Sequence, residues 1–258
     1  MTKRDDPEPY APGGVAAVDR AWHVLQALER STDGARQTPG ALPTPGVRLT
    51  DLARDTGLAL ATLSRLLASL EHAGLTRRGP DKRYALGPTL LRLGNAYRRS
   101  LRLEPLVAPL LAELGAATHE AASFSVRDGE HRLCLFRVES TLPLRESVAA
   151  GDRLALGVGA PSRVLRAFTE SDPRDDEIRA LGWAVSLGER VPELAAVAAP
   201  VFGVTDDADE GLVGVLSLSG LRSRFDGADL ELRRALVVAA AHRLSASLGA
   251  PAGTEHRP

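Results

Sequence analysis

The chain contains 258 residues, of which 44% are hydrophobic, and has a formal net charge of −1 at pH 7. This length allows two domains with separate hydrophobic cores. Its one cysteine, Cys134, excludes an intramolecular disulfide framework, and the lack of an apolar run of ~18 residues excludes a membrane-spanning helix. The N-terminus is too polar for a secretory signal peptide, so a cytoplasmic protein is expected.

The small net charge hides an asymmetry along the chain. Residues 1–102 carry 16 basic and 10 acidic side chains, whereas residues 103–258 carry 16 basic and 23 acidic ones. A basic segment suits a polyanionic partner such as DNA, and an acidic segment repels it. This pattern favours a DNA-binding domain followed by a domain with another role.

The first elements precede the basic segment. Residues 1–14 are polar and rich in proline and glycine, which predicts a disordered tail. Residues 15–30 keep apolar side chains at helical spacing and predict a helix, with Trp22 interpreted as a core side chain. Residues 31–46 contain three prolines and three glycines and are interpreted as a peripheral loop.

Two short helices are expected next. Thr50 is expected to cap a helix over 51–56, which ends at Gly57. A three-residue turn leads to a second helix over 61–72. Its leucines fall at i, i+3, i+4 and i+7 and form one apolar stripe: Leu63, Leu66, Leu67 and Leu70.

A basic hairpin follows the second helix. Strands over 75–78 and 83–86 flank a turn that contains glycine, proline and aspartate. The order of two helices and a hairpin is typical of a winged helix-turn-helix, in which the second helix enters the DNA major groove. Residues 46–102 carry eleven basic and four acidic side chains, which favours DNA over the alternative of a purely partner-binding module.

The expected DNA contacts fall into two groups. Arg65 is expected to contact base edges or the groove, with Thr62 and Ser64 beside it. The hairpin cations are expected to hold phosphates, which makes binding strongly dependent on salt: Arg77, Arg78, Lys82 and Arg83.

The rest of the chain predicts helices on one antiparallel sheet. A linker helix over 88–103 precedes a break at Glu104–Pro105 and a further helix to about Thr118. Strands are expected over 121–126, 132–138, 144–149, 183–186, 195–201 and 212–218, and helices over 162–168, 175–181 and 226–248. Residues 151–159 are expected to form a glycine-containing loop. Such an arrangement gives an α+β domain of the sensing type.

At this point the residues resemble a known family. The run LTDLARDTGLALATLSRLLASLEHAGLTRRGPDKRYALG resembles the DNA-binding half of the IclR-type bacterial transcription regulators, and VAAVDRAWHVLQALE is similar to that family's first helix. AGDRLALGVGAPSRVL is similar to its glycine-containing segment, and LGWAVSLGERVPELAAVAAPVF with GLVGVLSLSG to its effector-domain signature. The resemblance spans roughly residues 15–249.

The resemblance implies both an architecture and a function. It implies a winged helix-turn-helix joined by a linker helix to a GAF-like α+β effector-binding domain. The expected divisions are a tail (1–14), the DNA-binding domain (15–87), the linker helix (88–103), the effector-binding and oligomerisation domain (104–250) and a second tail (251–258). It also implies homodimers or tetramers on a near-palindromic operator, more often as a repressor.

The resemblance also places a small-molecule effector between the sheet and the glycine-containing loop. The lining carried over from the family is Leu154, Ala160, Ser186, Ala196, Ser217 and Ser219. Ser217 and Ser219 alternate with leucines on a strand, so both hydroxyls face one side and can bind a carboxylate or carbonyl. This lining favours a small, partly apolar organic acid. The alternative is that both are ordinary surface serines on a half-exposed strand.

Several positions depart from the family pattern. Residues 59–62, Ala-Leu-Ala-Thr, stand where the family usually has a Pro-Lys-Ser-Thr run, and Ser64 occupies a histidine-like slot. Ser186 and Ala196 stand where the family often has an acid and a cysteine. These replacements leave the operator and the effector open.

Other chemistry finds little support in the sequence. Cys134 is interpreted as a buried small apolar side chain, and the six histidines never fall at a usual metal spacing. The acidic pairs Asp206–Asp207 and Asp209–Glu210 are interpreted as a solvated loop. No catalytic set, metal site or cofactor is therefore expected. Two alternatives remain: a DNA-binding regulator whose C-terminal domain is only an oligomerisation scaffold, and an enzyme using the C-terminal cleft.

Overall fold

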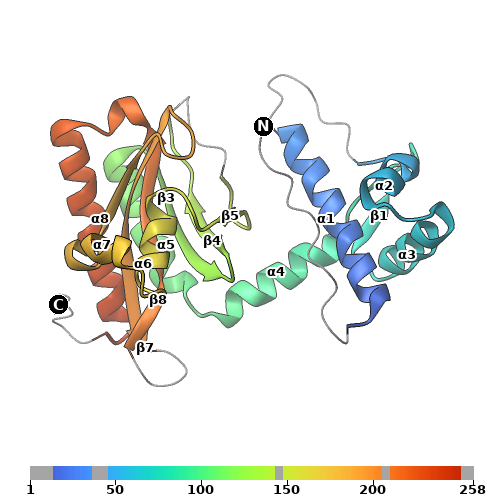
Figure 1. The fold of residues 1–258 in the computed structure, drawn as a ribbon, viewed down its shortest axis with the longest axis horizontal. Coiled ribbons are helices and arrows are strands. Elements are labelled where there is room, and N and C mark those ends of the chain that lie inside the picture. The colour runs from blue at the N-terminus through green and yellow to red at the C-terminus, as the bar shows by residue number, and fades with distance from the viewer. Residues whose placement is uncertain (1–13, 37–45, 143–147, 205–209, 251–258) are drawn as a thin grey trace. The chain divides into compact units, whose positions relative to one another are not determined.

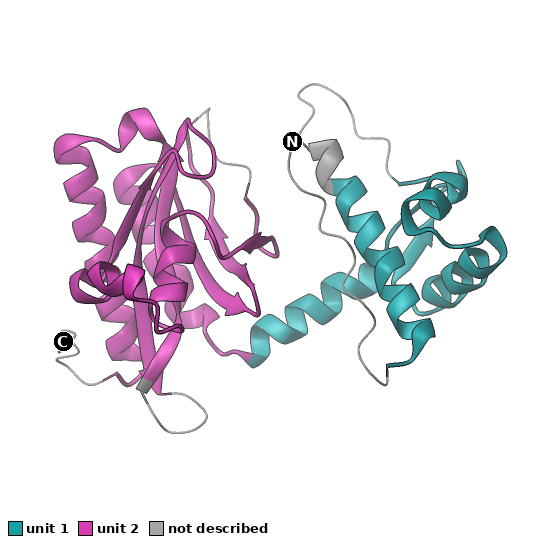
Figure 2. Cartoon of the chain, viewed as in Figure 1, with its two compact units in different colours: residues 1–100 teal, residues 101–258 magenta. Residues whose placement is uncertain are grey.

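The computed structural model describes residues 14–36, 46–142, 148–204 and 210–250. The chain divides into two compact units, Met1–Ser100 and Leu101–Pro258, each with its own core (Figures 1 and 2). The predicted α+β architecture is confirmed. Both predicted tails, except for residue 14, lie outside the described residues.

The first unit is a winged helix-turn-helix. Its elements are α1 (Ala16–Arg36), α2 (Leu49–Thr56), α3 (Leu60–His72), β1 (Thr76–Arg78), β2 (Tyr84–Leu86) and α4 (Pro88–Ser100). The strands β1 and β2 pair antiparallel as the wing. The core takes side chains from the first three helices and the wing: Val24, Ala27, Leu28, Leu52, Leu63, Leu67, Leu70 and Tyr84.

Two local predictions for this unit, the end of the first helix and the cap of the second, are wrong. The helix α1 continues to Arg36, into the predicted loop. The hydroxyls of Ser31 and Thr32 donate to the carbonyl of Leu28 within the helix, at 2.8 and 3.0 Å. Residues 37–45 of that loop lie outside the described residues. Thr50 lies inside the first turn of α2 and is not its N-cap. The N-cap residue is Arg48, whose side chain makes no capping hydrogen bond.

The prediction that Trp22 is a core side chain is also wrong, because 53% of its surface is exposed. The residues of α1 that reach the core lie on a neighbouring stripe, with Val24 and Leu28 four positions apart. The N-terminal half of α1 therefore carries a second, uncovered apolar stripe.

The second unit is a six-stranded antiparallel sheet with helices on both faces. Its strands are β3 (Ala121–Asp128), β4 (His131–Val138), β5 (Arg153–Ala155), β6 (Ala184–Leu187), β7 (Leu194–Val204) and β8 (Glu210–Leu221), in the spatial order β5-β4-β3-β8-β7-β6. Its helices are α5 (Glu104–Thr118), α6 (Ala160–Ala167), α7 (Asp176–Leu181) and α8 (Gly227–Ser247), with short 3₁₀ turns at Pro173–Asp175 and Arg222–Arg224. Leu101–Leu103, where Arg102 has φ 52°, separates α4 from α5, three residues earlier than the predicted break.

The two faces of the sheet are covered differently (Figure 1). On one face α5 and α8 bury the larger apolar core, which includes Phe124, Leu216, Leu218, Val237 and Leu244. On the other face α6 covers a smaller core, which includes Leu156, Val164, Leu165, Ala198 and Val215. Because α6 is only eight residues long, part of this second face is left to polar side chains.

The predicted strand over 144–149 is not a strand in its last two residues, and 144–147 lie outside the described residues. The strand that pairs with β4 is instead β5, inside the predicted glycine-containing loop, with Leu154 opposite Arg132. Backbone hydrogen bonds from Cys134 N to Asp152 O (3.0 Å) and from Gly151 N to Cys134 O (2.7 Å) lead into this pairing. Three predicted loop acids, Asp206, Asp207 and Asp209, also lie outside the described residues, whereas Glu210 begins β8.

Within the described ranges, the chain has no helix with both the length and the apolar character needed to cross a membrane.

Candidate functional site

The helix α3 has the two faces that a recognition helix requires. Leu63, Leu67 and Leu70 are buried against α1 and α2. Ser64 and Arg65 are exposed on the outer face, and Thr62 is half-buried beside them. The structure therefore brings the three predicted base-reading residues to one surface that is free of core contacts.

The wing presents three of its four cations to solvent. Arg77, Arg78 and Lys82 are exposed, and the guanidinium carbon of Arg78 lies 5.3 Å from the centre of the Tyr84 ring. Hydrogen bonds from Gly79 N to Arg83 O (2.8 Å) and from Lys82 N to Gly79 O (3.0 Å) close the turn.

Lys82 has φ 62°, in the left-handed region. That conformation costs a non-glycine residue roughly 1 kcal/mol, so the position would favour glycine or asparagine on conformational grounds alone. A lysine at this place keeps a positive charge at the tip of the wing despite that cost.

Arg83 differs from the other wing cations because it is tied into the wing. Its Nε lies 3.1 Å from Oδ2 of Asp81, and its Nη1 donates to the carbonyl of Gly46 at 3.2 Å. The same stretch of chain pairs Val47 with Tyr84 as an isolated β-bridge. This anchoring could not be predicted from local sequence patterns, because Gly46 lies 37 residues from Arg83.

The end of α3 is fastened to the beginning of α4. The hydroxyl of Thr89 donates to the carbonyl of Ala73 at 3.1 Å, and Thr89 N donates to Gly74 O at 3.1 Å. Gly87 lies so close to Gly74 that an added Cβ would be 2.2 Å from its carbonyl oxygen. Recognition helix and linker helix thus share one tightly packed junction.

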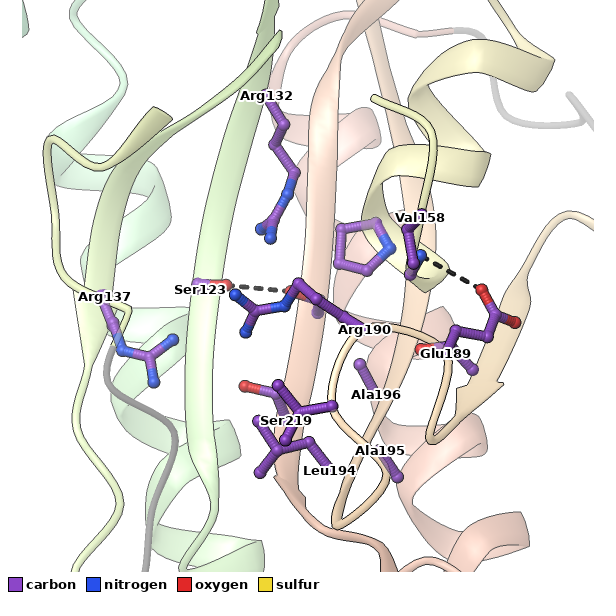
Figure 3. A pocket seen from close by; sticks show the side chains of 15 residues that line it. Ser123, Arg132, Arg137, Val158, Glu189, Arg190, Leu194, Ala195, Ala196 and Ser219 are labelled. Atoms are coloured by element: carbon purple, nitrogen blue, oxygen red, sulfur yellow. Dashed lines mark hydrogen bonds between the residues drawn. The ribbon is translucent and has the colours of Figure 1, made fainter. Parts of the chain in front are cut away.

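A small cavity lies on the α6 face of the sheet, beside the N-terminus of α6 and the loop between β6 and β7 (Figure 3). Its volume is about 30 Å³, enough for one or two water molecules. It is lined by Ser123, Arg132, Arg137, Val158, Gly159, Pro161, Ser186, Glu189, Arg190, Val191, Leu194, Ala195, Ala196, Ser217 and Ser219.

Four of the six predicted effector residues line this cavity: Ser186, Ala196, Ser217 and Ser219. The other two lie close by. Leu154 is half-buried on β5 beside Arg132, and Ala160 is the buried first residue of α6, between the lining residues Gly159 and Pro161. The sequence prediction did not include the charged part of the lining, namely Arg132, Arg137, Glu189 and Arg190.

The serines are part of a buried polar row across the sheet. Ser123 pairs with Ser217 in the β3–β8 ladder, and their hydroxyl oxygens are 2.9 Å apart. Ser217 and Ser219 are both buried, as is Ser186 on β6. The alternative that Ser217 and Ser219 are half-exposed surface serines is therefore wrong.

A β-bulge turns two arginines toward the same cavity. In the β3–β4 ladder Phe124 pairs with Phe136, but the next residue, Ser125, pairs with Cys134, so Leu135 is an extra residue on β4. Strict alternation would place residues 132 and 137 on opposite faces of the sheet. With the extra residue, Arg132 and Arg137 both line the cavity, which explains why alternation alone could not reveal them.

Both arginines are withdrawn from solvent. Arg132 is 7% exposed, and its Nη1 donates to the hydroxyl of Ser125 at 3.3 Å. The Arg137 side chain is 2% exposed, and its Nε donates to Oε1 of Glu139 at 3.2 Å. The cavity is therefore a polar site with buried positive charge.

The one carboxylate in the lining holds the cavity wall together. Glu189 accepts a hydrogen bond from Gly159 N at 3.1 Å through Oε2 and one from Arg163 Nη1 at 2.9 Å through Oε1. These contacts join the β6–β7 loop to the first turn of α6.

Cys134 is fully buried, as predicted, and burial raises the pKa of its thiol. A protonated, inaccessible thiol is not a nucleophile at neutral pH. Over the described parts of the chain, no three His, Cys, Asp or Glu side chains are grouped so that they could hold a metal ion.

The amino-acid sequence matches two family models, one in each unit. The IclR helix-turn-helix domain matches residues 17–80, and the C-terminal domain of the bacterial transcriptional regulator IclR matches residues 174–246. The HTH-type transcriptional regulator BhcR of Paracoccus denitrificans (strain Pd 1222) is 30% identical over 260 residues, which cover 90% of this chain and 87% of that protein.

Solved structures are similar over most of the chain. An IclR transcriptional regulator from Alicyclobacillus acidocaldarius matches with a TM-score of 0.72 and 25% identity, covering 90% of this chain and 98% of that one. An IclR homologue from Microbacterium hydrocarbonoxydans, complexed with 4-hydroxybenzoate, matches with a TM-score of 0.69 and 15% identity, covering 92% and 100%. Together with the exposed recognition helix and wing, the sequence matches establish that this chain belongs to the IclR family of bacterial transcriptional regulators.

Proposed function

We propose that this chain binds a near-palindromic operator as a homodimer or tetramer and responds to a small organic acid. One observation carries the effector part: buried Arg132 and Arg137 line the same cavity as the hydrogen-bonded pair Ser123 and Ser217. Arg137 already donates to Glu139 and Arg132 to Ser125, so a ligand would add to these contacts. A charge-assisted hydrogen bond is strong in a site withdrawn from water, which favours an anionic ligand. A carboxylate offers both the charge and two acceptor atoms for the guanidinium fork.

In the DNA-binding part of the proposal, Arg65 contacts a base edge with Thr62 and Ser64 beside it. Arg77, Arg78 and Lys82 hold phosphates. Arg83 is already bonded to Asp81 and Gly46, so it positions the wing and reaches phosphate only with its remaining edge. In a dimer, two recognition helices would enter successive major grooves about 34 Å apart.

In the effector part, Ser186, Ala196, Ser217 and Ser219 contact the ligand together with the cavity arginines. Leu154 and Ala160 act indirectly: Leu154 lies opposite Arg132 in the β4–β5 ladder, and Ala160 begins the helix that closes the cavity. The Microbacterium homologue named above holds an aromatic carboxylic acid, which supports an acid as the ligand class.

Effector binding is proposed to reach the DNA-binding surface through α4. This helix is joined to α3 by the contacts of Thr89 and Gly87 with the Ala73–Gly74 turn, and it continues into the second unit through Leu101–Leu103. The effector can change operator affinity only if it binds one arrangement of the α4 helices more tightly than another. In the proposed cycle the chain is a repressor that the effector releases from its operator.

An apolar stripe formed by the start of α1 and the residue before it supports self-association. Val15, Val18 and Trp22 are at i, i+3 and i+7, and all three are more than half exposed. Three large apolar side chains in one row favour burial against a second copy of the same surface. Because a bacterial chromosome lies in the cytoplasm, the cytoplasm is the proposed site of action.

A rival reading keeps DNA binding but makes the second unit only an oligomerisation scaffold. The observation in its favour is the cavity volume of about 30 Å³, which is too small for an organic acid unless the β6–β7 loop moves. Thermal unfolding in the presence of a panel of small organic acids separates the two readings. Stabilisation by at least one acid supports an effector site, and no stabilisation by any supports the scaffold.

The direct test begins with selection of bound sites from random duplex DNA. Anisotropy titrations on the selected site then measure the affinity with and without each stabilising acid. Combined Ser217→Ala and Ser219→Ala substitutions should weaken the response to the acid while leaving DNA affinity without acid unchanged. Failure to bind any duplex at low salt would overturn the whole proposal, whereas unchanged affinity with every acid would overturn only its effector part.

A further inference from the structure

The cavity lies beneath the loop between β6 and β7, and its volume of about 30 Å³ is too small for an organic acid. Residues 188–193 form this loop, and its residues Arg190 and Val191 line the cavity. We propose that residues 188–193 are a lid over the cavity and that Glu189 is the latch that holds the lid shut. The inference rests on the effector part of the function proposed above and adds the residue that controls entry to the site.

The base of the lid is fixed by backbone hydrogen bonds. Gly188 N donates to Leu194 O at 2.8 Å across the two ends of the lid, and Arg222 N donates to Glu193 O at 2.7 Å. Leu194 N also donates to Val191 O at 2.9 Å, which adds a turn within the lid. Gly188 has φ 79°, in the left-handed region that favours glycine. The lid is therefore a compact unit that can swing about its base without unfolding.

The side chain of Glu189 holds the lid against α6. Its Oε2 accepts a hydrogen bond from Gly159 N at 3.1 Å, and its Oε1 accepts one from Arg163 Nη1 at 2.9 Å. Figure 3 shows the bond to Gly159 as a dashed line beside Val158. Gly159 is the N-cap residue of α6 and has no side chain, so Glu189 supplies the negative charge that a helix N-terminus favours. The latch thus joins the lid to the opposite wall of the cavity.

The latch is weak enough to open. The side chains of Glu189 and Arg163 are 34% and 32% exposed, so water competes for both partners. Arg163 Nη1 also donates to Val185 O at 3.3 Å, and this bond remains when Glu189 moves away. If an acid binds only the open form, its apparent affinity falls with the fraction of molecules that are closed. Glu189 would therefore set the effector concentration to which the protein responds.

The first experiment measures lid opening without acid or DNA. Ser217→Cys places a thiol in the cavity at a position that is 2% exposed, where iodoacetamide reaches it only from the open form. Adding Glu189→Ala should accelerate the labelling about tenfold, because two hydrogen bonds that favour the closed form are lost. Cys134, fully buried on β4, is the internal reference, and its labelling should stay slow. Ser219→Cys, at 7% exposure, repeats the measurement at a second position if Ser217→Cys impairs folding.

Matched substitutions separate the latch from the lid in general. Glu193→Ala removes an exposed carboxylate from the same lid but keeps the carbonyl that accepts from Arg222, so the labelling rate should not change. Arg163→Met removes one of the two bonds of the latch and should accelerate labelling less than Glu189→Ala does. In the Arg163→Met background, Glu189→Ala should have a smaller effect than it has alone, because the two residues share a bond.

The second experiment connects the latch to binding. Calorimetric titrations of the full chain use benzoate, 4-hydroxybenzoate, pyruvate and succinate as probes. An acid that binds the unsubstituted chain should bind the Glu189→Ala variant more tightly, by about the factor found in the labelling. The Glu193→Ala variant should bind that acid as the unsubstituted chain does.

Three results would overturn the proposal. Equal labelling of the cavity thiol with and without Glu189 would remove the latch. Faster labelling of Cys134 together with the cavity thiol would show that the substitution loosens the whole sheet. Acid affinity unchanged by Glu189→Ala would show that entry does not require the lid to open.

A failure of the proposed function gives a different pattern. If none of the four acids binds while Glu189→Ala still accelerates labelling of the cavity thiol alone, the latch is supported and these acids are excluded as effectors. Failure to bind DNA would change neither the labelling nor the calorimetric result.

Discussion

Glu120 and Arg224, 104 residues apart in the sequence, form a two-bonded ion pair in which the carboxylate is completely buried. The nitrogen–oxygen distances are 2.6 and 2.7 Å, and Nη2 of Arg233 lies 3.5 Å from the same carboxylate. The hydrogen bond to Glu120 raises the pKa of Arg224. Gly220 makes room for the pair, because a Cβ at that position would lie 2.1 Å from Glu120 Oε2. The pair thus connects the start of β3 with the turn that precedes α8.

Arg224→Met should lower the free energy of unfolding by about 3–5 kcal/mol, because it leaves a buried carboxylate without its main partner. Urea unfolding of the full chain measures the change. Arg243→Met is the matched control, since Arg243 forms a similar pair with Glu113 but is 61% exposed. An exposed pair is weakened by water and salt, so its loss should have a much smaller effect. Equal effects of the two substitutions would contradict the role given to burial.

Arg65→Ala should weaken binding to the selected operator by about 1–3 kcal/mol and relax sequence preference at one base pair. The reason is the position of Arg65 on the exposed face of α3, opposite the buried leucines. Anisotropy titrations against the operator and its single-base variants measure both effects. Unchanged affinity would remove Arg65 from the recognition surface.

The wing should contribute through charge rather than sequence. Arg77→Ala combined with Arg78→Ala should reduce the slope of log affinity against log salt by about two units, uniformly across sequences. Lys82→Asn should reduce it by about one unit without loss of stability, because asparagine tolerates the left-handed φ of 62° at this position. A salt slope equal to that of the unsubstituted protein would mean that the wing does not contact the DNA backbone.

The second unit should lose stability in acid because the carboxylates of two arginine–aspartate pairs become protonated. Arg166 donates to buried Asp175 at 2.7 and 2.8 Å and holds the pKa of this carboxyl below its usual range, while Arg174 lowers the pKa of Asp172 to about 2. A lowered folded-state pKa adds stability above the unfolded value of about 4, which is lost as pH falls through the folded pKa. The unfolding free energy should therefore decline from about pH 4 toward pH 2.

Asp175→Asn is the corresponding substitution. It should flatten the decline in acid, because the amide no longer takes up a proton, and should lower stability at neutral pH. Unfolding in urea at a series of pH values measures both. A pH profile unchanged by Asp175→Asn would assign the acid sensitivity to other carboxyl groups.

Trp22→Glu should shift the chain toward smaller oligomers, because a charge in the exposed stripe of Val15, Val18 and Trp22 opposes its burial against a second copy. Sedimentation velocity at several protein concentrations measures the shift. Arg20→Glu is the control, since Arg20 is an exposed residue of α1 outside that stripe. If both variants sediment like the unsubstituted protein, the stripe is not part of an interface.

The local periodicity of apolar side chains was sufficient to predict most of the helices and strands. The leucine spacing of α3 depends only on residues within one helix, and the alternation of Ser217 and Ser219 only on one strand, so both were predictable. The extension of α1 to Arg36 was not predictable in this way. The three prolines and three glycines of residues 31–46 led to the prediction of a loop for the whole stretch. The strand β5 escaped prediction for a different reason. It exists only because β4 pairs with it.

The sequence analysis predicted four uncharged residues of the cavity lining but none of its charged residues. The four serine and alanine positions followed from the family resemblance and from alternation. The sequence analysis grouped Arg83 with the other wing cations. Its bond to Gly46 spans 37 residues, and local sequence patterns do not reveal a contact of that length. Arg137 was missed because one added residue in β4 changes which side of the sheet it faces, and register between strands is not visible in a single sequence.

The extra residue at Leu135 means that the charge of the cavity depends on the length of β4 as well as on its composition. A deletion of this one residue would restore simple alternation, and one of the two arginines would turn into the apolar layer beneath α5 and α8. A descendant of this protein could therefore lose or gain a ligand-facing cation by an insertion or deletion, with every arginine codon untouched.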